Sequence, residues 1–329
     1  MNQLTDAFGR RLNYLRISVT DRCNLRCVYC VPSKNFRLKQ RSQILTYEEI
    51  IRVCMIFAEM GIKKIRITGG EPLVRNNIEE LVSQLSALPE IKTVAMTTNG
   101  VLLKDKVHTL KLAGLASINI SLDTLRRDRF KKLTFSDRHQ DVIDGIESVL
   151  EAGFSPLKIN VVIVAGVNDD EVLDFVELAK TRPVNIRFIE FMPFKFNNWN
   201  ESSFVPSKKI RAEIERHHRL IPVNPQDNIP GPAKDYKIDG FAGTVSFITS
   251  ILDHFCNSCN RIRVTADGSI KLCLLSPGEV NILKSLRDGT GDEEIMKKIR
   301  LAITSKPERH LQTSELTGMK NRVMIQVGG

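Results

Sequence analysis

Residues 14–30 read YLRISVTDRCNLRCVYC, and this stretch decides the fold. Its first half, Tyr14–Thr20, alternates aliphatic side chains with polar ones, which is typical of a β-strand. Its second half carries cysteines at positions 23, 27 and 30. A zinc site needs four ligands, and the closest histidine is His108. The stretch therefore predicts a strand that ends in a loop of three cysteines.

Three thiolates suit a cubane iron–sulfur cluster, because they ligate three irons and leave the fourth iron open for a reactive ligand. Cys23, Cys27 and Cys30 directly follow a strand, so we expect the cluster at the carboxyl-end mouth of the sheet. A cluster with an open iron can chelate S-adenosylmethionine and cleave it reductively. The cofactor supplies this chemistry, and the protein positions it.

Short β-rich runs alternate with helix-period segments through the first two thirds of the chain. A strand–helix repeat of this kind predicts a parallel sheet with right-handed crossovers, and polar residues at the strand ends favour a partial (β/α)6 TIM-like barrel. The expected strands are Tyr14–Thr20, Lys64–Gly69, Val94–Asn99, Ser117–Asp123, Leu157–Val164 and Asn185–Met192, and the expected helices are Thr46–Met60, Ile78–Leu88, Asp105–Ala113, Asp141–Ala152 and Asp169–Lys180.

The segment Pro222–Pro232 contains four prolines and predicts a linker. We therefore expect a barrel domain over residues 1–230 and a C-terminal α+β domain over residues 231–329. The second domain should contain strands at Thr244–Thr249, Arg261–Thr265 and Ser269–Cys273, helices at Val280–Arg287 and Asp292–Thr304, and an extended tail at Asn321–Gly329.

A second cysteine triplet, Cys256, Cys259 and Cys273, lies in the C-terminal region. It predicts a second cluster with an open iron, which would hold a substrate rather than start the chemistry. A zinc site completed by His254 is the alternative. The seventh cysteine, Cys54, lies on the apolar face of an expected helix and is interpreted as a core residue.

Basic residues occupy alternate positions in several expected strands. With a period of two, these side chains face the barrel interior while the aliphatic ones face the helices. Buried cations without partners cost several kcal/mol, and pairing with an acidic neighbour such as Glu190 is the simplest way to avoid that cost. These cations outnumber such neighbours, so a small polyanion, best a triphosphate, is the expected ligand. The set is Arg16, Arg66, Lys158, Arg187, Arg261 and Arg263.

Three further positions should lie at the same mouth. Gly69 and Gly70 end the second strand, where glycine lets a backbone carbonyl approach a ligand such as the amino group of S-adenosylmethionine. The stretch Ser121-Leu122-Asp123 follows the fourth strand, and Met192 follows the sixth. Taken alone, Met192 is more typical of core packing.

Composition narrows the function class. The chain has 42% apolar residues and 26% charged residues, which is ordinary for a globular protein. The net charge of +10 is spread along the sequence, so we expect no nucleic-acid partner. With neither a membrane-length apolar run nor a signal-peptide pattern, we expect no membrane association and a reducing cytoplasmic location.

Together, these motifs resemble the GTP 3′,8-cyclase family, the radical S-adenosylmethionine enzymes that open molybdenum cofactor (molybdopterin) biosynthesis. The narrowest features are the second cysteine triplet with Arg261 and Arg263 and the terminal Gly328-Gly329. The resemblance implies a lyase that converts GTP to (8S)-3′,8-cyclo-7,8-dihydroguanosine 5′-triphosphate. It also implies two [4Fe-4S] clusters, a reducing electron donor, a homodimer, and transfer of the product to cyclic pyranopterin monophosphate synthase.

The resemblance also implies roles for individual residues. Tyr29, Gly70, Ser121 and Met192 would contact S-adenosylmethionine, and the two cysteine triplets would ligate the clusters. Arg16, Arg66, Thr97, Lys158, Arg261 and Arg263 would contact GTP. Arg16, Arg187, Gly328 and Gly329 would act at the catalytic centre.

Two other readings predict different observations. A peptide-modifying radical enzyme would need a groove for a chain substrate and usually more C-terminal cysteines than three. A zinc-stabilised nucleic-acid-binding module would carry its arginines on the surface, and its protein would be colourless.

Overall fold

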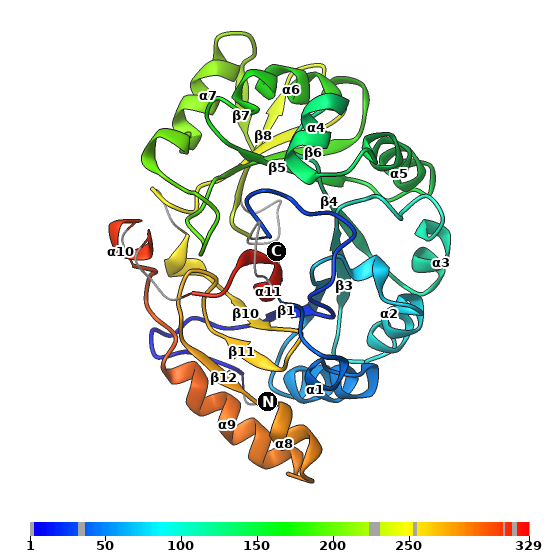
Figure 1. The fold of residues 1–329 in the computed structure, drawn as a ribbon, viewed down its shortest axis with the longest axis vertical. Coiled ribbons are helices and arrows are strands. Elements are labelled where there is room, and N and C mark those ends of the chain that lie inside the picture. Colours follow the sequence, from blue (N-terminus) through cyan, green and yellow to red (C-terminus); the bar gives the residue numbers. More distant parts are fainter. Residues whose placement is uncertain are drawn as a thin grey trace.

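One continuous sheet of twelve strands, in the order β12-β11-β10-β1-β2-β3-β4-β5-β6-β9-β8-β7, organises the molecule. The computed structural model describes residues 3–31, 37–223, 231–252, 255–311, 313–317 and 321–328. Figure 1 shows the strands curving around a central space, with helices on the outside and the C-terminal α11 inside the ring. The two ends of the sheet do not pair with each other, so the barrel is open.

The six central strands are parallel and follow chain order, which confirms the predicted partial barrel. They are β1 (Tyr14–Ser18), β2 (Lys64–Thr68), β3 (Thr93–Thr98), β4 (Ser117–Ser121), β5 (Leu157–Ile163) and β6 (Val184–Glu190). The helices between them are α1 (Tyr47–Glu59), α2 (Ile78–Ser86), α3 (Val107–Leu112), α4 (Arg127–Thr134), α5 (His139–Glu151) and α6 (Val172–Thr181). Helix α4 is not predicted from the sequence, because most of its eight residues are polar or charged and only Phe130 and Leu133 make an apolar face.

The aliphatic half of the strand alternation forms the core against the helices. Ile17 and Ile65 are fully buried, as are Val53 and Cys54 on α1, so the prediction for Cys54 is confirmed. A capping box with Thr46 starts α1, as the Thr-x-x-Glu pattern predicts. The polar half of the alternation is thereby directed into the barrel.

The C-terminal region adds strands to both edges of the central sheet. On one side, β10 (Arg261–Val264) pairs in parallel with β1, and β11 (Ser269–Lys271) and β12 (Glu279–Asn281) follow. On the other side, β9 (Thr244–Ile248) pairs in parallel with β6, and β8 (Ala233–Ile238) and β7 (Leu220–Pro222) follow. The predicted domains, 1–230 and 231–329, share this sheet, and the division between them stays a prediction.

Two C-terminal expectations are wrong. The segment expected as a helix at Val280–Arg287 begins as β12, because its backbone pairs with β11, and only α8 (Leu283–Arg287) is helical. The tail contains a short helix, α11 (Met324–Val327), because burying Ile325 and Val327 stabilises a turn that is too short to leave a periodic signal. The expected α9 (Asp292–Thr304) is confirmed, and the remaining helices are α7 (Ser207–Glu215) and α10 (Thr313–Thr317).

Most of the expected Pro222–Pro232 linker lies outside the described residues. Among the residues that are described, no helix has the length and apolar character needed to span a bilayer.

Candidate functional site

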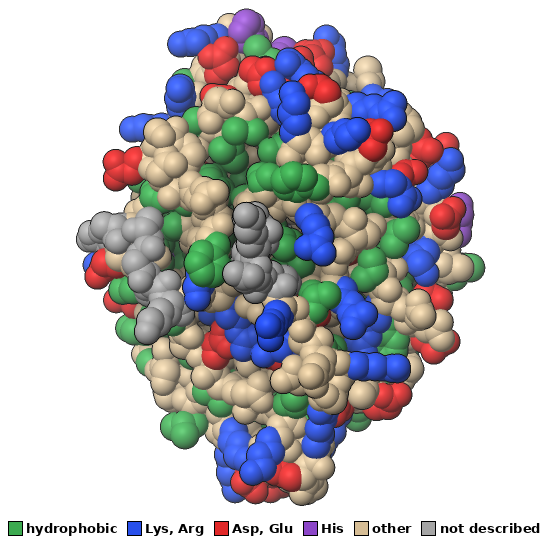
Figure 2. All heavy atoms as spheres, in the orientation of Figure 1, with side chains coloured by type: hydrophobic (Ala, Val, Ile, Leu, Met, Phe, Trp, Pro, Cys, Tyr) green, Lys and Arg blue, Asp and Glu red, His purple; other side chains and the backbone are tan. Residues whose placement is uncertain are grey.

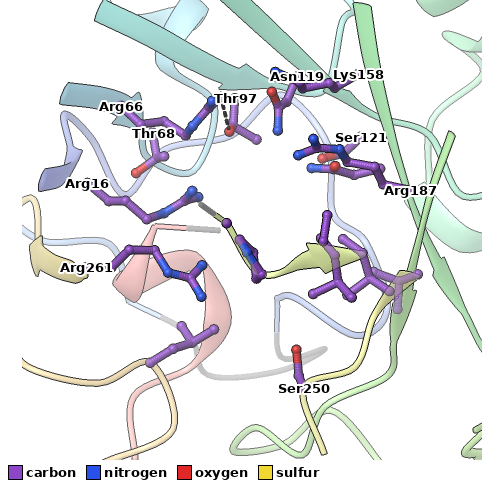
Figure 3. A pocket seen from close by; sticks show the side chains of 18 of the residues that line it. Arg16, Arg66, Thr68, Thr97, Asn119, Ser121, Lys158, Arg187, Ser250 and Arg261 are labelled. Carbon is purple, nitrogen blue, oxygen red and sulfur yellow. Dashed lines mark hydrogen bonds between the residues drawn. The ribbon is translucent and has the colours of Figure 1, made fainter. Parts of the chain in front are cut away.

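A cavity of about 980 Å³ occupies the centre of the barrel and is lined by both cysteine triplets. In Figure 3, Arg16, Arg66 and Arg261 point into one space, with Lys158 and Arg187 across from them. The predicted inward orientation of the basic residues is thus confirmed. Figure 2 shows other Lys and Arg side chains scattered over the surface, in agreement with the diffuse charge of the sequence.

The first triplet lies in the loop after β1, and its thiols are free. Backbone bonds to α4 hold the loop in place: Arg26 N–H donates to Thr134 O at 3.0 Å and Val28 N–H donates to Leu133 O at 2.9 Å. Burial raises the pKa of Cys23 to about 11. A thiol in this environment ionises at neutral pH only beside a cation such as cluster iron, which deprotonates its cysteine ligands.

The backbone of Gly70 packs directly against the backbone of the loop that carries the first cysteine triplet. A Cβ at this position would lie 2.3 Å from Arg22 O, and Gly70 N–H donates to Thr20 O at 2.7 Å. Only glycine allows this approach. The sequence predicts that glycine here allows approach to a ligand, but the observed neighbour is the loop that carries the cysteines.

Tyr29 is held by Asp123, a carboxylate that the sequence places at the mouth of the barrel without giving it a partner. The Tyr29 hydroxyl donates to Asp123, which also accepts from Val162 N–H at 2.9 Å. Asp123 follows β4, as the Ser-Leu-Asp stretch predicts, and it lines the cavity together with Ser121 and Met192. All four predicted S-adenosylmethionine contacts, Tyr29, Gly70, Ser121 and Met192, therefore line the cavity together with Asp123.

The second triplet also lines the cavity, with Cys256 in a short 3-10 turn (Cys256–Ser258) and Cys273 just after β11. Its three thiols are free and partly buried. Burial raises the pKa of Cys259, but the charges of Lys306 and Arg261 outweigh burial and leave that pKa below its usual value. The proposed zinc ligand His254 lies outside the described residues.

Both donor sets fit iron–sulfur clusters better than single ions. Among the described residues, no three His, Cys, Asp or Glu side chains converge on a position for one metal ion. In a cubane each thiolate ligates a different iron, so its cysteines stand further apart than around one ion. Each site instead offers three cysteine sulfurs that face the cavity, and cysteine thiolates are the usual ligands of such clusters.

Positive charge dominates the cavity. Among the described residues, its lining includes five arginines and five lysines, against two carboxylates, Asp123 and Asp235. Glu190 does not neutralise the cations, because its carboxylate accepts from the backbone N–H groups of Ser207 at 3.1 Å and Ile251 at 2.9 Å. Glu190 is therefore not the acidic partner of the arginines, although the charge of another acidic neighbour, Asp235, acts on Arg187.

Hydrogen bonds hold two of these cations, Arg66 and Arg187. Arg66 donates to Met96 O at 2.8 Å, to the Tyr14 hydroxyl at 2.5 Å and to Thr97 Oγ1 at 3.4 Å. Arg187 donates to Asn185 Oδ1. The carbonyl, amide and Thr97 hydroxyl oxygens orient a guanidinium without cancelling its charge, whereas Tyr14 offsets part of the Arg66 charge when it is ionised.

The crowding of cations is visible in their pKa values. Burial, followed by the charges of Arg187 and Arg66, lowers the pKa of Lys158 to about 8. Burial lowers the pKa of Arg187 to about 10. Tyr14, whose burial acts in the opposite direction, has its pKa lowered to about 7 by Arg66 and Arg16. A polyanion would relieve this repulsion.

The C-terminal tail reaches the same cations. Arg263 Nη1 donates to Gly328 O at 2.6 Å, and Gly328 has a φ of +74°. A Cβ on Gly328 would lie 2.5 Å from Thr68 Oγ1, so both the backbone and the space require glycine. Gly329, the other predicted tail residue, lies outside the described residues.

Comparison with known proteins identifies the family. Residues 17–179 match the Radical SAM superfamily, and residues 184–312 match Molybdenum Cofactor Synthesis C. The GTP 3′,8-cyclase of Moorella thermoacetica is 43% identical over 99% of this chain and 100% of its own length. The chain belongs to the GTP 3′,8-cyclase family.

Further relatives and one solved structure are also similar to this chain. The mitochondrial GTP 3′,8-cyclase of Arabidopsis thaliana is 46% identical over 100% of this chain and 84% of its own length. Human molybdenum cofactor biosynthesis protein 1 is 42% identical, and the chain spans 51% of it. The crystal structure of Streptococcus suis SuiB bound to S-adenosylmethionine has a TM-score of 0.62 at 15% identity, with 95% of this chain and 76% of that chain covered. At that identity, the likeness concerns the fold alone.

Proposed function

We propose that this protein converts GTP to (8S)-3′,8-cyclo-7,8-dihydroguanosine 5′-triphosphate, the first step of molybdenum cofactor biosynthesis, as a radical S-adenosylmethionine lyase. Two three-cysteine sites that share one cation-lined cavity are the observation that carries the proposal. When bound at the first triplet, a [4Fe-4S] cluster supplies the electron that cleaves S-adenosylmethionine to methionine and a 5′-deoxyadenosyl radical.

The residues at the first triplet hold the cofactor. Tyr29, fixed by Asp123, would pack against S-adenosylmethionine, and Ser121 and Met192 would complete its site. Gly70 brings the backbone of β2 onto the cysteine loop. These contacts would keep the reactive carbon directed toward the cavity, and positioning of this kind supplies much of the rate in a radical reaction.

The basic residues bind the substrate. Arg16, Arg66, Thr97, Lys158, Arg261 and Arg263 would hold the triphosphate, since guanidinium groups match phosphate oxygens. Arg187 and Gly328 would act at the catalytic centre with Arg16, and we extend the same proposal to Gly329. The residues Cys256, Cys259 and Cys273 would ligate a second cluster that holds the guanine base opposite the adenosyl group. Such a cavity suits a small triphosphate better than a peptide chain.

Air-free reconstituted protein tests this function. Incubation with GTP, S-adenosylmethionine and reductant should yield 5′-deoxyadenosine and a cyclised nucleotide by mass analysis, and the protein should bind about eight irons per chain. Cys256→Ala should retain S-adenosylmethionine cleavage but form no cyclised nucleotide, whereas Cys54→Ala, a matched change in the core, should retain both. Zinc at the second triplet, or iron for a single cluster, would disprove the proposal.

The family resemblance supports the remaining elements of the proposal. We propose a homodimer, a reducing electron donor for the first cluster, and cyclic pyranopterin monophosphate synthase as the enzyme that receives the product. We also propose that residues 1–230 and 231–329 act as a barrel domain and a C-terminal domain. A cytoplasmic location agrees with six free cysteines as cluster ligands, because a reducing compartment keeps thiols from forming disulfides.

A further inference from the structure

Two buried cations lie behind the second triplet, outside the cavity. Arg10 is 9% exposed and Lys306 is 3% exposed, and neither lines the cavity. The proposed reaction assigns them no role. Burying a cation costs several kcal/mol unless its surroundings compensate, so both positions need an explanation.

Arg10 connects the N-terminal arm to the loop of the second triplet. Its Nη1 donates to Cys256 O at 2.8 Å and to Glu308 O at 2.6 Å, and its Nη2 donates to Pro307 O at 2.7 Å. Its Nε pairs with Asp6 at 2.6 Å, and the Asp6 side chain is fully buried. One guanidinium thus joins the backbone of a cluster cysteine to two segments distant in sequence.

Lys306 holds the other two cysteine segments. Its Nζ donates to Arg261 O at 3.1 Å and also to Leu272 O. Arg261 follows Cys259 by two residues, and Leu272 directly precedes Cys273. Each segment that carries a cysteine of the second triplet is therefore bound, through a backbone carbonyl, by either Arg10 or Lys306.

These contacts have an electrostatic consequence for whatever the triplet binds. A cubane with three thiolate ligands is negatively charged, and reduction by one electron makes it more negative. Asp6 offsets the charge of Arg10, whereas Lys306 donates its hydrogen bonds to neutral carbonyls. Positive charge beside a cluster stabilises its reduced form, since net charge is one of the factors that set cluster potentials.

We propose that Arg10 and Lys306 form a cationic clamp that positions the second triplet and makes the cluster held there easier to reduce. The inference rests on the proposed second cluster. Arg10 acts mainly by position, because Asp6 offsets its charge. Lys306 acts by position and by charge, and both are positioning residues.

Lys306→Met, which removes the charge and keeps most of the length, tests the clamp in the full-length reconstituted protein. Iron analysis and redox titrations followed by electron paramagnetic resonance give the occupancy and potential of each cluster, and signals absent from Cys256→Ala identify the second cluster. We expect a more negative potential or lower occupancy for the second cluster, restored by Lys306→Arg. The first cluster and its S-adenosylmethionine cleavage without GTP should be unchanged. Arg10→Ala should lose about four irons per chain, one cubane's worth.

Lys298→Met is the matched control, because Lys298 lies on α9 at the surface, 3.6 Å from Glu294. It should change neither cluster. If wild-type protein holds one cluster only, the two-cluster function fails and the clamp fails with it. If both clusters are present and Lys306→Met leaves the second cluster's occupancy and potential at wild-type values, the clamp alone is wrong. Loss of the second cluster in both Lys306→Met and Lys306→Arg would also contradict a role for charge.

Discussion

Raising the pH should weaken GTP binding, and Lys158 should account for a defined part of the loss. In the free protein, burial and the neighbouring charges of Arg187 and Arg66 lower the pKa of Lys158 to about 8. Bound phosphates would return that pKa toward its ordinary value of ~10.4, because they offset the neighbouring cations. Binding above pH ~8 is therefore coupled to proton uptake.

The coupling between GTP binding and protonation of Lys158 gives both the direction and the size of the change in GTP affinity with pH. Below pH ~8, Lys158 is already protonated and the full affinity is present. At about pH 9 roughly one free molecule in ten carries the proton, whereas the complex still carries it, so affinity falls about tenfold between about pH 7 and about pH 9. The loss should continue until the pH reaches the pKa in the complex.

Equilibrium binding of GTP without S-adenosylmethionine or reductant measures this effect. Lys158→Met should bind GTP more weakly at neutral pH. Between about pH 7 and about pH 9, its affinity for GTP should fall about tenfold less than that of the wild type. Ionisation of GTP itself and of Tyr14 is common to both proteins, so the difference between them isolates Lys158. Lys104→Met, a surface change beside Asp144, is the matched control for loss of charge. Identical pH dependence in wild type and Lys158→Met would refute the reasoning.

Three further changes test the packing around the site. Gly70→Ala should lower 5′-deoxyadenosine formation by about tenfold or more, because its Cβ would collide with Arg22 O in the cysteine loop; an unchanged rate would contradict the close approach. Glu190→Ala should lower the free energy of unfolding by about 2–3 kcal/mol in urea denaturation, since it leaves two buried amide groups unpaired, and a loss within error of zero would argue against it. Gly328→Ala should abolish GTP cyclisation, whereas Gly289→Ala, also at positive φ but in open space, should not.

Local sequence patterns predicted much of the site. Alternation in Arg16 and Arg66 was sufficient to direct both side chains inward, because a strand reverses its side chains at every residue whatever it pairs with. The spacing of Cys23, Cys27 and Cys30 similarly predicted a ligand loop after a strand. The aliphatic half of the same pattern predicted the core.

Other parts of the site depend on contacts between distant segments. The partner of Glu190 is the backbone of Ser207 and Ile251, which sequence proximity to Arg187 does not reveal. The Tyr29–Asp123 bond joins residues 94 positions apart. A carboxylate at a strand end marks a possible site, but its partner is set by the register of the sheet.

The chain by itself determined which side chains face the barrel and which loops carry sulfur, because both follow from spacing along a few residues. The folded molecule alone decided that the C-terminal strands flank β1 and β6, and that Arg10 meets Cys256 across 246 positions. Pairing of that kind is selected by burial and hydrogen bonding summed over the whole sheet. No short stretch of sequence contains that sum.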